Sequence, residues 1–483
     1  MEEKEKESDN VKIEEPSDDD ILIEETKQSC YSKKGPIIMI IGIILIIMAL
    51  IITLYYIFQK NLNNHNYIIA KYLIKRKSLY YNIFYHTFND SIEKIYINNT
   101  EVNIYNNMTF NNEGIVEIKI KFNKKLKNLD NLFYNCYSLE EVDLSFLYSE
   151  EVISATDMFN GCKNLKKINF EDFKSKNLYN ISNMFSRCEK LSTVDVDIFS
   201  YDKLKDIFGL FFNCLELKKI NFGDFNTKNV INMSKLFSGC ISLNEINLNN
   251  AKNFKTENVQ DMSYMFYNCK NLENINLEKF DTSNVIHMNN MFDSCENLKK
   301  LELKSFNTKT VENMFYMFSN CKNLTSINLN NFDTSNVKDL FAMFKDCTNL
   351  EHLELKSFNT SLVQDMGELF GNCQKLNSIN ISNFDVKNVE NMIGMFEGCS
   401  QLKSLNLSNF ETKSLEDADY FLFNCSNLDI IDLRKFDTHK LKNTTNFFYL
   451  NSKNATLIYN SSIFNLTIPS NWTKVDINNN TIN

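Results

Sequence analysis

The sequence predicts an α/β solenoid: a right-handed array of 26-residue strand-turn-helix units with a parallel sheet, preceded by one transmembrane helix. Three observations support this fold class, namely a regular cysteine series, two different periodicities within each unit, and one long apolar segment near the N-terminus. Twelve of the 13 cysteines recur with a period of 26, broken by a single interval of 29. Self-similarity at such a period indicates units that stack on one another. The series is Cys136, Cys162, Cys188, Cys214, Cys240, Cys269, Cys295, Cys321, Cys347, Cys373, Cys399 and Cys425.

Residues 1–34 form an acidic N-terminal tail. They contain twelve Asp or Glu and six Lys, a net charge of −6, and few apolar residues. Such a composition cannot bury a core, so the tail is expected to be disordered. Cys30, the cysteine outside the series, is close enough to the apolar segment to be a candidate palmitoylation site, although a chance position is the better explanation.

Residues 37–58 are the candidate transmembrane helix. They carry no charge, and 22 residues of helix span about 33 Å, enough to cross a hydrocarbon layer. A cleaved signal peptide is the alternative, but the run is too long and no small-residue cleavage pattern follows it. Membrane binding is therefore predicted through residues 37–58.

The predicted orientation places the N-terminus in the cytoplasm and the repeats outside the cell or in a lumen, as in a single-pass type II protein. Basic residues near the span give only a weak bias toward this orientation. Sixteen Asn-X-Ser/Thr sequences follow the span and none precedes it. The candidate N-glycosylation sites singled out among them are Asn89, Asn180, Asn323, Asn380, Asn406, Asn424 and Asn471.

Two segments precede the repeats. Residues 59–88 are interpreted as a stalk. Residues 89–125 are interpreted as an N-terminal cap, because "GIVEIKIKF" at 114–122 alternates strictly between apolar and polar residues, as a strand does.

Each repeat has two halves with different periods, as the unit NFDTSNVKDLFAMFKDCTNLEHLELK at 331–356 shows. Val337, Leu340, Phe344 and Cys347 are spaced by three and four residues, which predicts one face of a helix of two to three turns. Asp333, Thr334 and Ser335 would cap its start. The alternation around Leu353 and Leu355 predicts a short strand with its apolar side inward.

The repeats are expected to occupy 126–434, and the pattern decays at 435–483, which is the predicted C-terminal cap. One phenylalanine column confirms the register of eleven units. It comprises Phe173, Phe199, Phe225, Phe254, Phe280, Phe306, Phe332, Phe358, Phe384, Phe410 and Phe436.

The Cys-x-x-Leu-x-x-Leu-x-Leu-x-x-Phe frame and the phrase "FDTSNV…MF..C" resemble the BspA-type leucine-rich repeats of bacterial, mycoplasma and protist surface proteins. The resemblance covers about residues 110–460. It implies a right-handed leucine-rich-repeat-like solenoid and a surface protein used in adhesion or recognition.

Three interpretations of the cysteine column remain open. Zinc binding needs local clusters of ligands, which one thiol per unit does not provide. Disulfides between adjacent units are possible but strained, because parallel side chains keep the Cβ atoms too far apart. Packing as a small buried residue is favoured, since the cysteine shares the apolar face with Phe344.

No enzyme constellation, cofactor motif or metal site is identified, and the protein is predicted not to be an enzyme. The five histidines fall at non-equivalent positions, as solvated residues do. Outside the tail the charges nearly balance, with 46 Lys or Arg against 49 Asp or Glu, so nucleic acid is not an expected partner.

The outward strand positions form the candidate binding face, because they tile one open surface. A merely solvated face is the alternative explanation. The candidate residues are Glu273, Asn274, Asn276 and Glu278 in one unit, Lys299, Lys300, Glu302 and Lys304 in the next, and Glu351, His352, Glu354 and Lys356 in a third.

Two functions follow from these observations. The first is a membrane-anchored surface protein whose repeats bind protein or glycan partners on a cell or extracellular surface. The second is a glycosylated structural or coat spacer without a specific ligand. A reversed topology, with the repeats in the cytosol, is a third possibility.

Overall fold

The computed structural model of the chain describes residues 44–54, 66–199, 202–248, 251–442, 444, 446–449, 454–479 and 481–482. It separates into two units, Met1–Asn63 and Asn64–Asn483. The predicted acidic tail, including Cys30, lies outside the described residues.

The described part of the first unit is an α-helix at 44–54 whose side chains are exposed. This helix covers the middle of the predicted span 37–58, and the remaining residues of that span lie outside the described part. Among the described residues, no helix reaches the length and apolar character of a membrane span.

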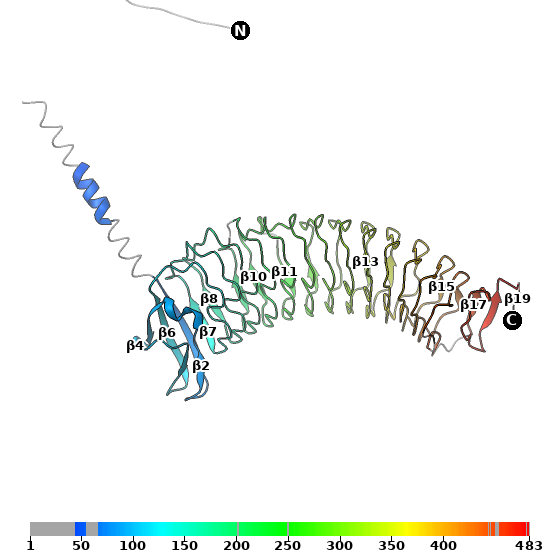
Figure 1. Cartoon of the computed structure of the whole chain (residues 1–483), viewed down its shortest axis with the longest axis horizontal. Helices are drawn as coiled ribbons and strands as arrows, with labels where there is room; N and C mark the ends of the chain where they lie inside the picture. Colours follow the sequence, from blue (N-terminus) through cyan, green and yellow to red (C-terminus); the bar gives the residue numbers. More distant parts are fainter. Residues whose placement is uncertain are drawn as a thin grey trace, which may run out of the picture. The chain divides into compact units, whose positions relative to one another are not determined.

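The second unit begins with a cap built around a mixed sheet (Figure 1). The central strand β1 runs antiparallel to β6 and to β7, and every second residue of β1 is buried. Residues from Tyr67 onward therefore belong to the cap, and the stalk predicted for 59–88 is wrong over this part. The elements are β1 (Tyr67–Ile74), β2 (Tyr80–Asn82), the 3-10 helix η1 (His86–Ser91), β3 (Ile92–Ile97), β4 (Thr100–Val102), β5 (Asn107–Thr109), β6 (Gly114–Phe122) and β7 (Leu139–Asp143).

The repeats follow as rungs that stack side by side (Figure 1). Each paired strand lies parallel to its equivalent in the neighbouring repeat, for example Ser326 beside His352, and Glu245 beside Asn274 at the long repeat. The strands are β8 (Lys167–Asn169), β9 (Thr193–Asp195), β10 (Lys219–Asn221), β11 (Glu245–Ile246), β12 (Asn274–Ile275), β13 (Ser326–Asn328), β14 (His352–Glu354), β15 (Ser404–Asn406) and β16 (Ile430–Asp432). The predicted solenoid with a parallel sheet is confirmed.

The helix predicted in each repeat is wrong. Residues 341–346 form consecutive turns, in which Ala342 and Asp346 adopt positive φ angles of 54° and 59°. Alternate N–H groups bond within the rung, as that of Met343 does to the oxygen of Leu340 at 3.2 Å. The N–H groups between them bond to the next rung, as that of Phe344 does to the oxygen of Leu369 at 3.0 Å. The α/β class is therefore replaced by a β-solenoid of strands and turns.

The turn side carries a continuous parallel ladder of single bridges. It runs from Asn128 through eleven bridges to Asp417. On the strand side, by contrast, β9–β10, β11–β12 and β13–β14 are separate two-stranded sheets. Pairing is thus continuous on the turn side and interrupted on the strand side, where single backbone bonds, such as that from the N–H of Asn297 to the oxygen of Lys270 at 3.1 Å, join some of the rungs between the strand pairs.

The core lies between these two sides and runs through the whole array as one cluster. Phe292, Phe318 and Phe344 are fully buried and stack on one another with ring centroids 5.8 and 5.6 Å apart. The predicted apolar set of Val337, Leu340, Phe344 and Cys347 is also fully buried. The sequence pattern therefore identified the inward residues correctly although it predicted the wrong backbone.

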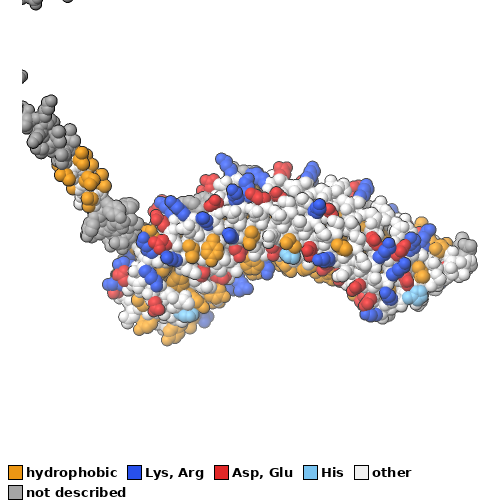
Figure 2. Space-filling view, turned by 45° about the horizontal axis from the view of Figure 1, so that its top comes forward, with side chains coloured by type: hydrophobic (Ala, Val, Ile, Leu, Met, Phe, Trp, Pro, Cys, Tyr) orange, Lys and Arg blue, Asp and Glu red, His pale blue; other side chains and the backbone are white. Residues whose placement is uncertain are grey.

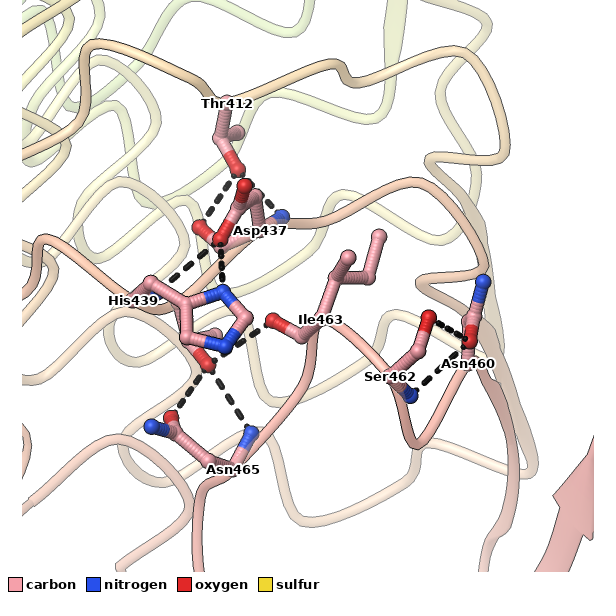
Figure 3. Close-up of polar contacts among 8 residues, drawn as sticks. Thr412, Asp437, His439, Asn460, Ser462, Ile463 and Asn465 are labelled. Atoms are coloured by element: carbon pink, nitrogen blue, oxygen red, sulfur yellow. Dashed lines mark hydrogen bonds and ion pairs between the residues drawn. The ribbon is translucent and has the colours of Figure 1, made fainter. Parts of the chain in front are cut away.

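A buried threonine column links successive rungs. Thr412 donates its hydroxyl to the oxygen of Asp437 at 2.9 Å and accepts the N–H of Asp437 at 2.7 Å (Figure 3). Thr334 makes the same pair of bonds with Asn359, both at 2.8 Å. The residue predicted as a helix cap is therefore a cross-rung connector.

The C-terminal segment continues the strand side. β17 (Thr456–Tyr459) pairs with β16, followed by β18 (Thr473–Asp476) in parallel and β19 (Thr481–Ile482) antiparallel. Trp472 and Phe448 pack against each other with centroids 5.0 Å apart and close this end of the core.

Candidate functional site

The twelve predicted binding residues lie on the strand side, which we call the strand face. All are exposed except Glu351, which is half-buried. The residues between them, such as Ile275, Leu301 and Leu353, are buried. The expected alternation of outward polar and inward apolar side chains is therefore present in these three rungs.

Several of these charges pair with each other. Glu273 and Lys299 form an ion pair of 2.8 Å across two adjacent rungs. Glu302 pairs with Lys304, and Glu354 with Lys356, at 3.6 Å within their own rungs. All of these side chains are well exposed, so each pair stabilises the fold by at most about 1 kcal/mol. Their charges nonetheless offset one another across the face.

Two grooves open where the strand face lacks strand pairing. One, of about 620 Å³, lies between β10 and β11 and has Ile220 and Ile246 in its lining. The other, of about 430 Å³, lies beside β8 and β9. Lys219 and Asn221 of β10 line both grooves. Strand β10 therefore contributes to both grooves.

The opposite, turn face carries half-buried aromatic side chains that the sequence analysis did not single out. The ammonium nitrogen of Lys235 lies 5.5 Å from the ring centroid of Phe208, 6.0 Å from that of Phe212 and 5.5 Å from that of Tyr264. Cations at this distance are attracted by ring faces. The signal that could have revealed this cluster is the replacement of Asn, Gly or Ser by Lys or an aromatic residue at turn positions.

Farther along the turn face lies a partly buried charged cluster. Burial raises the pKa of Asp293, whose carboxylate accepts bonds from Asn290 at 2.8 Å and Ser294 at 2.9 Å. Lys345 and Glu368 form an ion pair. Burial, followed by the charge of Glu368, raises the pKa of Glu397. These groups come from distant sequence positions, so a single repeat could not have indicated that they share one face.

The cysteine column is internal. All twelve cysteines of the series are buried free thiols. Each from Cys162 onward donates to a phenylalanine carbonyl of the preceding rung, as Cys347 does to Phe318 at 3.1 Å. Burial raises the pKa of Cys347 to about 12, which keeps its thiol neutral and unreactive. This arrangement agrees with the packing interpretation.

The candidate acceptor asparagines differ in accessibility. Asn180 is half-buried, and its side-chain oxygen accepts the N–H of Ser182 at 2.8 Å within the turn-side ladder. Asn380 and Asn406 lie on the strand face. The exposed candidates are Asn89, Asn323, Asn380, Asn406, Asn424 and Asn471.

Metal chemistry finds no support in the part of the chain that the structure describes, where no group of three or more His, Cys, Asp or Glu side chains could hold an ion. The histidines lie apart, with His287 on the turn-side ladder and His352 on the strand face.

Comparison with solved structures finds proteins that are similar to this chain. It is similar to a leucine-rich repeat protein from Bacteroides ovatus ATCC 8483, with 19% identity over 71% of this chain and 90% of that chain and a TM-score of 0.36. It is similar in the same way to a leucine rich cell surface protein from Faecalibacterium prausnitzii A2-165, with 19% identity over 67% and 79% of the two chains and a TM-score of 0.36. No curated protein matches the chain.

A family model matches most of the array. The model is described as "Mycoplasma protein of unknown function, DUF285", and its matches overlap along the repeats at residues 98–219, 127–247, 192–276, 242–353 and 340–461. The BspA-type leucine-rich-repeat resemblance predicted from the sequence is confirmed. With its matched region running from residue 98 to residue 461, the chain belongs to the DUF285 family.

Proposed function

We propose that this chain is a surface recognition protein, anchored in a membrane through residues 37–58, whose repeat array binds protein or glycan partners outside the cell or in a lumen. The observation that carries the proposal is the strand face. Its outward side chains are exposed in the rungs of residues 273–278, 299–304 and 351–356, and two grooves lined by both polar and apolar residues open on the same face in the preceding rungs, around β8 to β11. Protein interfaces commonly combine polar and apolar surface in this way.

The proposal assigns the partner to the strand face, and this assignment can be tested with matched variants. The first variant combines Lys300→Ala, Glu302→Ala and Glu354→Ala on that face. The control combines Lys309→Ala, Glu312→Ala and Glu390→Ala, which change the same charges at exposed positions elsewhere. Saturable binding of residues 64–483 to cell surfaces should weaken with the first set and persist with the second. Equal binding by both sets would exclude this part of the face.

Glycan mapping provides a second test of the same assignment. Asn380 and Asn406 are exposed on the strand face, so glycans there would cover it. We expect mass spectrometry of the natural protein to find both asparagines unmodified. Full occupancy of both would count against a binding face at this end of the array.

Topology requires its own experiment on intact cells expressing the full chain. In the proposed orientation, external protease degrades the repeats and leaves the N-terminal tail protected. Repeats that survive while the tail is cleaved would exclude the orientation.

A structural spacer is the second candidate function. The ion pairs between Glu273 and Lys299, Glu302 and Lys304, and Glu354 and Lys356 favour it, because these strand-face charges are already matched within the protein. Absence of saturable binding on host, prey and self-cell surfaces would support the spacer.

A further inference from the structure

The tip of the N-terminal cap combines exposed apolar side chains with a basic turn. Tyr80 is 80% exposed, Ile115 is 53% exposed and Leu79 is 50% exposed. Ile115 pairs with Leu73 near the end of β1, and Leu79 and Tyr80 follow the turn that leaves β1. Figure 2 shows hydrophobic side chains gathered at the lower end of the cap. Exposed apolar side chains that gather at one end, rather than being scattered singly, are typical of interaction sites.

The turn between β1 and β2 places three cations beside these side chains. Lys75, Arg76 and Lys77 are consecutive and exposed, and they form no ion pair with the described residues. Gly114 pairs with Ile74, the last residue of β1 before the turn. Glu113, which directly precedes Gly114, therefore places one carboxylate at this end of the sheet. Three positive charges and one negative charge leave the tip with a net charge of +2.

Hydrogen bonds hold the turn in one conformation. The N–H of Arg76 donates to the Tyr81 hydroxyl, and that hydroxyl donates to the oxygen of Arg76, both at 2.9 Å. Ser78, with a positive φ of 60°, donates its N–H to the oxygen of Phe110 at 3.0 Å. The Tyr81 ring packs on Phe110, so Tyr81 fixes the turn while Tyr80 points outward. The basic residues are therefore presented by a preorganised loop.

The chemistry of this tip fits the surface of an anionic lipid bilayer. Lys and Arg are attracted to anionic headgroups, and the amphipathic ring of tyrosine favours the headgroup region. The few apolar side chains beside them would enter the boundary between headgroups and acyl chains, as those of membrane-surface helices do. A soluble protein partner would require a larger complementary surface than one turn.

We propose that this tip, formed by Lys75, Arg76, Lys77, Leu79, Tyr80 and Ile115, binds an anionic membrane surface. This inference deepens the proposed function. It rests on that proposal because the proposed anchor, residues 37–58, would bring a bilayer near the tip. Eight residues, 59–66, separate the predicted span from β1, and a chain of eight residues reaches roughly 28 Å when extended. Strand β1 itself extends about 26 Å. The tip is thus within reach of the bilayer that residues 37–58 would cross.

The test uses residues 64–483, a compact unit with its own continuous core, and phospholipid vesicles. We expect co-sedimentation with phosphatidylglycerol vesicles, weaker co-sedimentation with phosphatidylcholine vesicles, and loss of binding at 0.5 M salt, where the Debye length falls to a few ångströms (about 4 Å). Each basic residue near an anionic surface contributes about fivefold to partitioning. Lys75→Gln, Arg76→Gln and Lys77→Gln together should therefore reduce partitioning by about a hundredfold.

The matched control is the set Lys228→Gln, Lys309→Gln and Lys387→Gln, which removes the same charge from exposed positions on the array. It should bind as the unmodified unit does. Leu79→Ser with Tyr80→Ser should weaken binding even at low salt, and circular dichroism checks that every variant is folded. Equal binding by the two glutamine sets, equal binding to both lipids, or binding to neither would overturn the proposal.

The absence of residues 37–58 from the tested unit separates the two proposals. Failure of vesicle binding would refute the tip as a membrane surface and leave the anchored recognition protein intact. Failure of protease accessibility on cells would refute the proposed orientation and leave the vesicle result unchanged.

Discussion

Replacement of Thr334 tests whether the threonine column holds the rungs together. Thr334 is fully buried, and its hydroxyl makes two hydrogen bonds of 2.8 Å to the backbone of Asn359 in the next rung. Thr334→Val keeps the shape of the side chain and removes both bonds. An unsatisfied buried group costs about 1–3 kcal/mol. Because Asn359 is itself exposed, we take the lower value for each bond and expect a loss of about 2 kcal/mol in the free energy of unfolding.

Thr334→Ser is the matched control, since it keeps the hydroxyl and loses only a methyl group, which costs about 1 kcal/mol. Urea denaturation of residues 64–483 compares the variants, and hydrogen exchange of the Asn359 amide provides a local measurement that does not require two-state unfolding. The valine variant should be the less stable of the two and should exchange faster at Asn359. A valine variant as stable as the serine variant would refute the connecting role of the hydroxyl.

Three further predictions concern the thiols, the turns and the repeat length. Because burial raises the pKa of Cys347 to about 12 whereas an unfolded thiol titrates near pH 8.5, the folded state binds more protons above that pH. The melting temperature should therefore fall as the pH rises from about 9 toward 12, and a constant melting temperature over this range would contradict the burial of the thiols. A thiol-reactive reagent should label twelve array cysteines in a denatured sample and none in a native one. Gly239→Ala should destabilise the array by a few kcal/mol, because the added Cβ would lie 2.0 Å from Oδ1 of Asn213. Gly371→Ala is the control and should change the stability little, because its Cβ would meet no atom closer than 3.3 Å. Thermal unfolding compares the two variants. Deleting residues 327–352 removes one full repeat and joins Ser326 to Leu353 in register, so circular dichroism should show a folded array. Deleting residues 327–350 breaks the register, so this variant should not give a folded array.

The repeat length, the inward residues and the parallel stacking could be predicted from the sequence because each is repeated in every unit. Phe344 and Cys347 are buried for the same reason as their equivalents, and one register serves all. The helix could not be excluded by spacing alone. A chain of turns with a left-handed residue every fourth position also brings residues three and four apart onto one side.

The composition of the turn positions contained the missing information. Left-handed backbone favours Asn and Gly, and those positions include Asn131, Asn213, Asn320, Gly239 and Gly398. An α-helix would avoid such residues at its centre. The twelve candidate residues lie on one face, as the alternation indicated, and their role in binding stays a prediction. The tip of the cap was missed, because residues 67–82 lie outside the repeats and their pairing with β5 and β6 is long-range.

The unequal bonding of the two sides has a mechanical consequence. The bridges on the turn side join every rung from Asn128 to Asp417, while strand pairing on the strand side is interrupted, for example between β10 and β11. A load that bends the rod so that its strand side opens acts where strand pairing is absent, whereas bending in the other sense must stretch a continuous ladder. The array is therefore compliant in one direction and stiff in the other, and a ligand wedged between β10 and β11 would change its curvature without breaking a strand pair.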